Sequence, residues 1–162
     1  RRAGQGLGER LSGDQDFLQL QKYTNVKQFD PVKKIFLSHN DPGRYLQEHI
    51  LRGDSGDDVP NILSDDDTFV NKNKSQRRLM QTKVDLWVDL RPEDFCDEIM
   101  LRNYRRNEQL IDLSKVPQSL QDEILNLHAT ELKKPQQSLF KYFMKHNLGN
   151  LAESISDFRL MA

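Results

Sequence analysis

Cysteine, tryptophan and long apolar runs are scarce in this sequence of 162 residues, which has one Cys and one Trp. The single Cys96 excludes a disulfide within the chain and favours a reducing compartment. No apolar run approaches the roughly 20 residues that a membrane-spanning helix needs, so we expect no membrane partner. The sequence also has no large excess of either charge, since its 24 Lys and Arg residues nearly balance its 25 Asp and Glu residues. This balance excludes a uniformly basic protein that coats nucleic acid.

Two acidic turns stand out from this balanced background. Residues 12–17 carry Asp14 and Asp16, and residues 51–60 carry Asp54 and Asp57. Aspartate is a short carboxylate ligand, and Mg²⁺ prefers one or two carboxylates together with water and phosphate oxygens. The two turns therefore form a candidate divalent-ion site. Either turn alone is more typical of a solvated loop, because Asp and Gly favour turns for backbone reasons.

The order and spacing of the motifs carry a family resemblance. Ser-Gly-Asp-Gln-Asp-Phe-Leu-Gln-Leu at 12–20 is followed by Asn-Val-Lys-Gln-Phe at 25–29 and by Ile-Leu-Arg-Gly-Asp-Ser-Gly-Asp at 50–57. This series resembles the structure-specific 5′ nucleases, the flap endonucleases and 5′-3′ exonucleases, and among them the ribonuclease H branch of T-even-type bacteriophages. The resemblance runs from about Ser12 to the C-terminus and covers only the C-terminal half of such an enzyme.

The resemblance implies an α/β fragment. Residues 12–40 would be the C-terminal edge of a PIN-like nuclease core, and residues 41–162 a mainly α-helical DNA-binding region with a helix-three-turn-helix element. Residues 1–11 are Arg- and Gly-rich, whereas the family has a hydrophobic strand before the first acidic turn. We expect these residues to be a disordered tail, because they lack the apolar side chains of a buried strand.

The activity implied is 5′ to 3′ hydrolysis of phosphodiesters in RNA-DNA hybrids and in duplex or flap DNA. It would remove primers during lagging-strand replication in the cytoplasm of an infected bacterial host. Two Mg²⁺ ions, replaceable by Mn²⁺, would take part: Asp14 as a shared or first-site ligand, and Asp16, Asp54 and Asp57 as ligands of the second ion. Asp58 would act through another ligand at most. The family's other carboxylates lie upstream of this sequence, so we expect the chain alone to be inactive.

Cationic residues after the second turn are candidate nucleic-acid contacts, and they are Lys72, Lys74, Arg77, Arg78 and Lys83. We predict that they bind the phosphate backbone without reading sequence. A solvated loop over residues 71–78 is the alternative. The resemblance also implies a monomer whose partners are nucleic acid and phage replication proteins, such as a single-stranded-DNA-binding protein or a sliding clamp.

Local signals predict strands at 26–29 and 34–37, with Val26, Phe29, Ile35 and Leu37 buried. They also predict a helix that is capped by Asp41, opened by Pro42 and ended by Gly53. Its His49 is expected to be a half-buried, hydrogen-bonded residue and not a metal ligand. Further helices are expected at 79–90, 92–104, 116–127, 139–144 and 151–158, with Trp87 in the core.

Two other details are expected from the same patterns. Ser64 is expected to cap a helix that begins with Asp65–Asp67. Three arginines are expected near the C-terminal end of their helix, where they would contact DNA or interact favourably with the helix dipole: Arg102, Arg105 and Arg106.

Two other classes of function fit the sequence. The chain would be a non-catalytic DNA-binding or replication-adaptor protein if the acidic turns were remnants. It would be a calcium-binding structural protein if the loop from Asp54 bound Ca²⁺. That loop has Val59 where an EF-hand needs glycine, and Asp65 where it needs glutamate.

Overall fold

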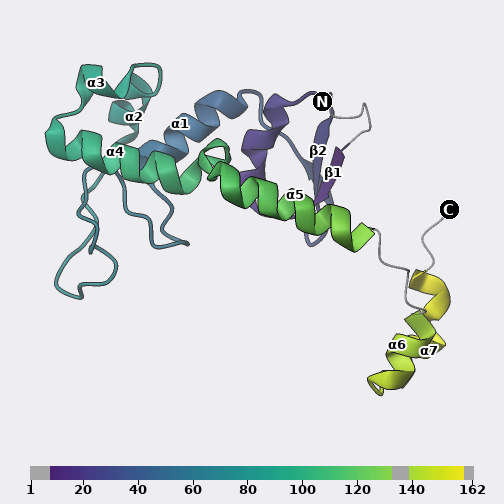
Figure 1. Ribbon diagram of the computed structural model, residues 1–162. Coiled ribbons are helices and arrows are strands. Elements are labelled where there is room, and N and C mark those ends of the chain that lie inside the picture. Colours follow the sequence, from purple (N-terminus) through teal and green to yellow (C-terminus); the bar gives the residue numbers. More distant parts are fainter. Residues whose placement is uncertain (1–7, 133–138, 159–162) are drawn as a thin grey trace. The chain divides into compact units, whose positions relative to one another are not determined.

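The computed structural model describes residues 8–132 and 139–158. The chain divides into two compact units, Arg1–Val116 and Pro117–Ala162, which are taken separately below. The elements of the first unit are β1 (Gly8–Leu11), η1 (Gln15–Lys22), β2 (Val26–Asp30), β3 (Ile35–Leu37), α1 (Pro42–Arg52), α2 (Gln81–Trp87), α3 (Pro92–Phe95), α4 (Glu98–Ile111) and η2 (Leu113–Lys115). The first unit is therefore a mixed α/β structure, as expected, with more helix than strand (Figure 1).

A three-stranded sheet has the order β1-β2-β3, with β1 parallel and β3 antiparallel to β2. The expectation that residues 1–11 form a disordered tail is wrong for Gly8–Leu11, which pairs with β2 from Gly8↔Val26 to Leu11↔Phe29. A ladder of backbone hydrogen bonds needs no apolar side chain, and Leu11 remains 73% exposed. Residues 1–7 lie outside the described part of the chain.

The strands at 26–29 and 34–37 are confirmed, but the prediction of which side chains they bury is wrong. Val26, Phe29 and Leu37 are only half-buried, and Ile35 is exposed. The buried positions of β2 are polar: Gln28 is 1% and Asp30 2% exposed. Gln28 Nε2 donates to backbone carbonyls of the first acidic turn, and the Asp30 carboxylate accepts from the Val32 and Lys33 N–H groups, so hydrogen bonds offset the cost of burying these groups. Gln28 Oε1 is buried without a partner among the described residues.

The helix α1 follows its predicted signals from end to end. The Asp41 carboxylate accepts a hydrogen bond from the Arg44 backbone N–H at 2.9 Å, and Pro42 is the first helical residue. Gly53 ends the helix with φ of 69°, where a Cβ atom would collide with the Val59 carbonyl. The second acidic turn therefore begins directly at the end of α1.

The hydrophobic core of the first unit joins α1, α2, α4 and the loop that follows α1. It consists of Ile50, Leu51, Val59, Ile62, Val84, Val88, Tyr104 and Ile111. Trp87 packs against this cluster and stacks on Phe95 with ring centroids 5.1 Å apart, so its assignment to the core is confirmed. Val84 and Val88 form the buried side of this region, and Leu86 and Leu90 lie on its exposed side.

The helix expected at 92–104 is two helices in the structure. It breaks at Cys96 and Asp97, where the Asp97 carboxylate accepts a hydrogen bond from the Met100 N–H at 2.8 Å and caps α4. Burial, together with the charges of Asp97 and Glu93, raises the pKa of the Cys96 thiol to about 11. The only cysteine is therefore a packed, unreactive thiol.

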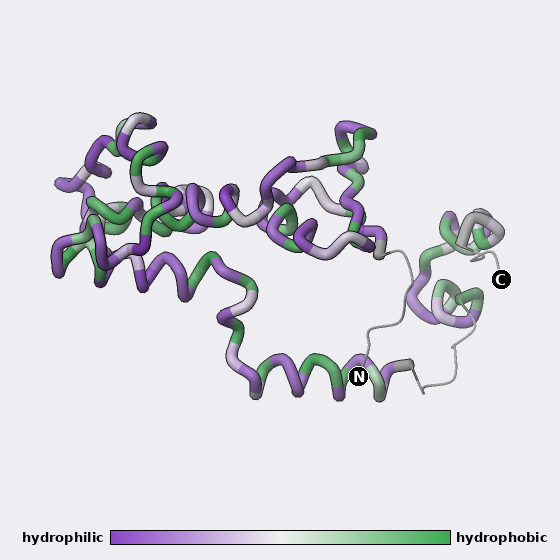
Figure 2. Tube along the Cα trace, turned by 90° about the horizontal axis from the view of Figure 1, so that it is seen from above, coloured by the Kyte–Doolittle hydropathy of each residue, from purple (hydrophilic) through white to green (hydrophobic). Residues whose placement is uncertain are grey.

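The second unit contains α5 (Gln118–Leu132), α6 (Leu139–Lys145), α7 (Gly149–Glu153) and η3 (Ile155–Phe158). The helices predicted at 116–127 and 139–144 are present as α5 and α6, whereas the one predicted at 151–158 is divided into α7 and η3. Hydrophobic and hydrophilic residues interchange along α5 (Figure 2). Phe143 is buried, but Leu120, Ile124 and Leu127 are exposed, so the packed seam predicted for α5 is not observed. Among the described residues, none of the helices is both long and apolar enough to cross a membrane.

Candidate functional site

An acidic hollow lies where the start of η1 meets the end of α1. It has a volume of about 430 Å³ and is lined by Asp14, Gln15, Asp16, Tyr45, Glu48, His49, Arg52, Gly53 and Asp54. Four of these residues are acidic: Asp14 and Asp16 come from the first predicted turn, Asp54 comes from the second, and Glu48 lies on α1. The sequence places the turns almost forty residues apart, and the fold brings them together as predicted.

Three side chains in the acidic hollow converge on one point. Single ligand atoms of Asp16, His49 and Asp54 all lie within 4.8 Å of one another. His49 Nε2 lies 3.1 Å from Asp54 Oδ2, and His49 Nδ1 lies 3.6 Å from Asp16 Oδ1. The prediction of a half-buried, hydrogen-bonded His49 is confirmed. The position of His49 between the two turns was missed, although His49 lies in the last turn of α1, five residues before Asp54.

The other two predicted ligands lie at the margin of the cluster. The Asp14 carboxylate accepts a hydrogen bond from the Asp16 N–H at 3.0 Å and caps η1, while Asp57 is exposed. The pKa of Asp16 is raised, first by burial and then by the charges of Asp14, Asp54 and Asp57, against the opposing effect of His49. The four carboxylates therefore share one electrostatic site, with Asp16 and Asp54 at its centre.

Hydrogen bonds fix the backbone of both acidic turns. Gln28 Nε2 donates to the carbonyls of Ser12 at 2.8 Å and Asp14 at 2.5 Å. The Asp54 carbonyl accepts from the Val59 N–H at 2.7 Å, and its carboxylate accepts from the Gly56 N–H at 2.8 Å. The role of Gln28 was missed because a strand with a polar buried face does not show the alternating pattern on which the prediction relied.

The donor set of the acidic hollow fits a hard divalent cation. Asp16 and Asp54 offer carboxylate oxygens at one point, and Mg²⁺ and Mn²⁺ prefer such oxygens. The burial and mutual repulsion that raise the pKa of Asp16 are the conditions that a bound cation relieves. His49 suits this ion less well as a ligand, and its Nε2 lies within hydrogen-bonding distance of the Asp54 carboxylate.

The five predicted nucleic-acid contacts have different surroundings. Lys74 Nζ pairs with Asp67 at 2.6 Å and with Asp65 at 2.9 Å, and Lys83 Nζ lies 5.4 Å from the centre of the Trp87 ring. Lys72 is exposed. Arg77 and Arg78 line a second hollow, of about 510 Å³, which we call the cationic hollow; its lining is Arg52, Gly53, Ser55, Asn61, Gln76, Arg77, Arg78 and Leu79.

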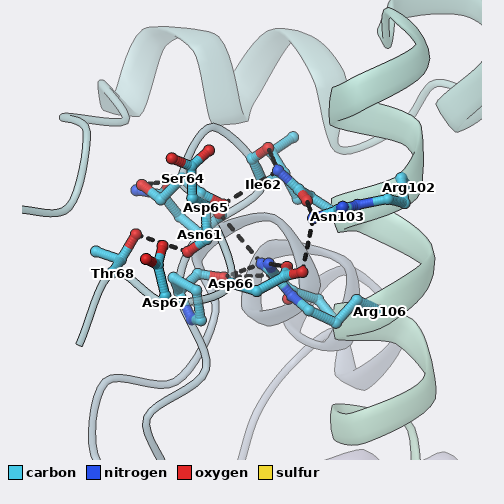
Figure 3. A network of polar contacts seen from close by, with 12 residues as sticks. Asn61, Ile62, Ser64, Asp65, Asp66, Asp67, Thr68, Arg102, Asn103 and Arg106 are labelled. Atoms are coloured by element: carbon cyan, nitrogen blue, oxygen red, sulfur yellow. Dashed lines mark hydrogen bonds and ion pairs between the residues drawn. The ribbon is translucent and has the colours of Figure 1, made fainter. Parts of the chain in front are cut away.

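A network of polar contacts joins residues 61–68 of the loop to α4 (Figure 3). The Asp66 carboxylate, on the loop, pairs with Arg102 at 2.7 Å and with Arg106. Asn103 Nδ2 donates to the carbonyls of Ile62 at 3.0 Å and Ser64 at 3.1 Å. The side chains of α4 thus hold the loop in place, as Figure 3 shows.

Two predictions about this network are wrong. Ser64 does not cap a helix, because residues 66–70 form turns. Its hydroxyl donates to Asn61 Oδ1 at 2.9 Å and accepts from the Arg77 N–H at 2.9 Å. The expected position of three arginines near the C-terminal end of their helix is wrong too, because α4 continues to Ile111 and has no basic residue in its last turn. Arg102 and Arg106 pair with Asp66, and Arg105 pairs with Glu93 and Glu108.

Comparison with known proteins defines the class of this protein. Residues 45–158, more than half of the chain, match the family model described as T4 RNase H, C terminal. The chain therefore belongs to this family, as the resemblance predicted.

A particular relative fits the same assignment. The chain is 28% identical over 157 residues to the ribonuclease H of Enterobacteria phage T4, and the aligned region covers 91% of this chain and 50% of that protein. The chain thus spans about half the length of this curated relative.

Proposed function

We propose that the chain is the C-terminal part of a phage 5′ to 3′ exonuclease and flap endonuclease of the ribonuclease H type. Its substrates would be RNA-DNA hybrids and duplex or flap DNA, and its role the removal of primers in lagging-strand replication in the cytoplasm of the infected host. The observation that supports this most is the acidic hollow, in which two distant turns bring carboxylates together in a chain of this family.

Within this proposal, Asp16 and Asp54 bind a divalent ion, Mg²⁺ or Mn²⁺, and Asp14 and Asp57 complete its surroundings. Such an ion supplies an activated water and stabilises negative charge on phosphate and leaving oxygens. The residues of the chain prepare this site: His49 orients the Asp54 carboxylate, and Gln28 fixes the turn that carries Asp14. Two ions would be bound in the complete enzyme, whereas the described residues bring carboxylates together for one.

The DNA-binding part of the proposal uses the segment from α1 to α2. These helices and the irregular residues 53–80 between them would be the helix-three-turn-helix element that grips duplex DNA, and the small sheet the edge of a PIN-like core. Lys72, Lys74, Arg77, Arg78 and Lys83 would contact phosphates, Lys74 after exchanging its carboxylate partners. The protein would act as a monomer beside phage replication proteins such as the single-stranded-DNA-binding protein or the sliding clamp.

Cleavage assays test the proposal on labelled 5′-flap DNA and RNA-DNA hybrid, with Mg²⁺ or Mn²⁺. We expect the chain alone to bind these substrates without cleaving them. In the complete protein that contains this chain, we expect Asp54→Asn to lower the cleavage rate by at least about 100-fold. Mutating a residue that hydrogen-bonds to a metal ligand costs up to about 100-fold in activity, and losing the ligand itself should cost no less. The matched control is Asp122→Asn, which alters an exposed carboxylate outside both acidic turns.

Other outcomes would change the assignment. Cleavage by the chain alone, abolished by Asp54→Asn, would show that the visible carboxylates are sufficient. DNA binding without any cleavage by the complete protein would favour the second candidate, a non-catalytic DNA-binding or replication-adaptor protein, which the cationic hollow would also serve. The calcium-binding alternative is disfavoured because the Val59 N–H closes the turn back on the Asp54 carbonyl, unlike an open 12-residue calcium loop.

A further inference from the structure

Both ring nitrogens of His49 face a carboxylate of the acidic hollow. Nε2 lies 3.1 Å from Asp54 Oδ2, which is a hydrogen-bonding distance, and Nδ1 lies 3.6 Å from Asp16 Oδ1, which is too long for a hydrogen bond. A neutral imidazole has one N–H group and one nitrogen with a free lone pair. The distances therefore favour the hydrogen on Nε2, so that Nδ1 turns its lone pair toward the Asp16 carboxylate.

The spacing of these atoms matches the spacing of ligands around a metal ion. Two ligand atoms that each lie about 2.0–2.2 Å from a tetrahedral Zn²⁺ ion are about 3.4 Å apart. His49 Nδ1 and Asp16 Oδ1 are separated by 3.6 Å, and one atom each of Asp16, His49 and Asp54 lies within 4.8 Å of the others. A small shift of these side chains would let a single ion bind to all three.

The surroundings of His49 hold its ring in the way that metal-binding histidines are held. A histidine that binds a metal through one nitrogen usually donates its other N–H to a carboxylate, which fixes the orientation of the ring. Asp54 is such an acceptor, and the Gly56 N–H donates to its other oxygen at 2.8 Å. Tyr45, one turn earlier on α1, makes a T-shaped contact with the His49 ring at 5.7 Å between centroids. The imidazole is therefore oriented before any ion binds.

A nitrogen ligand changes which ions the acidic hollow prefers. Mg²⁺ prefers surroundings made only of oxygen, whereas imidazole suits Zn²⁺ and related transition-metal ions. Carboxylates are ligands for both kinds of ion. The expectation that His49 is not a metal ligand applies to a hard cation such as Mg²⁺, and it does not extend to ions that accept nitrogen.

We propose that Asp16, His49 and Asp54 form a mixed imidazole–carboxylate site that binds Zn²⁺ more tightly than Mg²⁺, with His49 Nδ1 as the nitrogen ligand. This site rests on the proposed function for its two carboxylates, and it adds a third ligand to them. Three protein ligands leave one position of a tetrahedral ion open for water or a phosphate oxygen. Zn²⁺ and Mg²⁺ would therefore compete for the same place in the acidic hollow.

Calorimetric titration of the chain with ZnCl₂ and, separately, with MgCl₂ measures this preference. Loss of a side chain that only supports a metal ligand lowers metal affinity about 10–100-fold, so we expect His49→Gln to weaken Zn²⁺ binding at least about 10-fold. Mg²⁺ binding should stay near that of the wild type, because glutamine can still donate a hydrogen bond to Asp54. The control His128→Gln removes an exposed histidine of α5 and should change neither affinity.

NMR of the chain with ¹⁵N-labelled histidine rings separates a metal ligand from a supporting residue. The chain has four histidines, and the signals of His49 are those that disappear in His49→Gln. If this variant does not fold, substitution of His39, His128 and His146 identifies the same signals by elimination. Addition of ZnCl₂ to the wild type should move the Nδ1 signal of His49 to the range of a metal-bound nitrogen and leave Nε2 protonated.

The outcomes separate this site from the proposed function. An Nδ1 signal that does not move in Zn²⁺, equal Zn²⁺ affinity of the wild type and His49→Gln, or tighter binding of Mg²⁺ than of Zn²⁺ would overturn the mixed site. Each of these results would leave the proposed carboxylate site for Mg²⁺ or Mn²⁺ standing. If the wild-type chain bound neither Zn²⁺ nor Mg²⁺, the mixed site and the proposed ion site would both fail.

Discussion

Two clusters of aspartate in the first unit look alike in sequence and differ in how their charge is neutralised. Asp66 lies in a turn and meets the guanidinium groups of Arg102 and Arg106. Asp16 and Asp54 also lie in turns, but they meet each other, with His49 between them. The network around Asp66 is therefore complete in itself, whereas the acidic hollow has more negative charge than its neighbours balance.

The pKa values of Asp66 and Asp16 move in opposite directions. The hydrogen bond from Arg106, aided by Arg102, lowers the pKa of Asp66. Burial and neighbouring carboxylates raise the pKa of Asp16. Clustered acidic residues are thus no evidence for a metal site in themselves; what distinguishes the acidic hollow is that the protein provides no arginine or lysine partner for Asp16 or Asp54 within the described residues.

The largest expected difference between the two clusters is that a divalent ion stabilises the folded chain through the acidic hollow and not through Asp66. An ion that binds only the folded chain raises the free energy of unfolding by about 4 kcal/mol at 1,000 times its Kd. We expect Mg²⁺ or Mn²⁺ to raise the melting temperature of the wild type and of Asp66→Asn. The double variant Asp16→Asn/Asp54→Asn should show no such rise, and calorimetric titration should find no binding. Equal ion binding by the double variant would remove this site from consideration.

Features of this site that depend on neighbouring residues in the sequence could be predicted, whereas features that depend on contacts between distant segments could not. The sequence singled out four aspartates because turn residues and family motifs are local in sequence, and the fold brings Asp16 and Asp54 to one point. His49 was assigned its hydrogen-bonded state but not its place between the turns, because that place depends on how η1 packs on α1. The pairing of Asp66 with α4 was missed for the same reason: nearly forty residues separate the partners, and both faces of α4 carry charged residues.

A second prediction concerns the link between the two clusters. Asn107 on α4 is fully buried and donates through Nδ2 to the carbonyl of Ile50 at 2.8 Å, close to the acidic turn, and to that of Pro60 at 2.9 Å, close to the network. We expect Asn107→Ala to lower the free energy of unfolding by about 1–3 kcal/mol, because the Ile50 carbonyl is left buried without its partner. Denaturant unfolding measures the effect.

The matched control for this substitution lies on the same helix. Leu110 is 63% exposed, so Leu110→Ala should change stability by less than about 0.5 kcal/mol. Equal losses in the two variants would mean that α4 is weakened as a helix and not as the support of both clusters.

The fold was predicted best where a residue acts on its own backbone. Asp41, Pro42 and Gly53 placed α1 almost to the residue, because caps and breakers act within one turn. Burial was predicted less well: Gln28 and Asp30 are buried instead of the apolar side chains of β2, since the turns beside the strand need hydrogen-bond partners. The apolar rhythm of α5 predicted a helix correctly and its burial wrongly, because periodicity reports an apolar face and not the surface that covers it.

The smallest expected effect is a difference in sign between two single substitutions, measured without divalent ions. The folded-state pKa of Asp66 is lowered, so its ion pairs contribute stability above the pKa of the unfolded chain and lose it as pH falls through the folded-state pKa. Asp66→Asn should therefore cost about 0.2–1 kcal/mol at neutral pH, the range of exposed ion pairs. This cost should vanish in acid.

Asp16→Asn should act in the opposite direction. Because the folded-state pKa of Asp16 is raised, its ionised form opposes folding above that pKa, and wild-type stability from this group rises as pH falls through it. Removing the charge should leave the chain as stable as the wild type or slightly more stable at neutral pH, and this advantage should fade in acid. Denaturant unfolding of both variants at neutral and acidic pH, in EDTA, gives the comparison. Destabilisation of similar size by both substitutions at neutral pH would mean that Asp16 is already satisfied by His49, and the acidic hollow would then have no need of a cation.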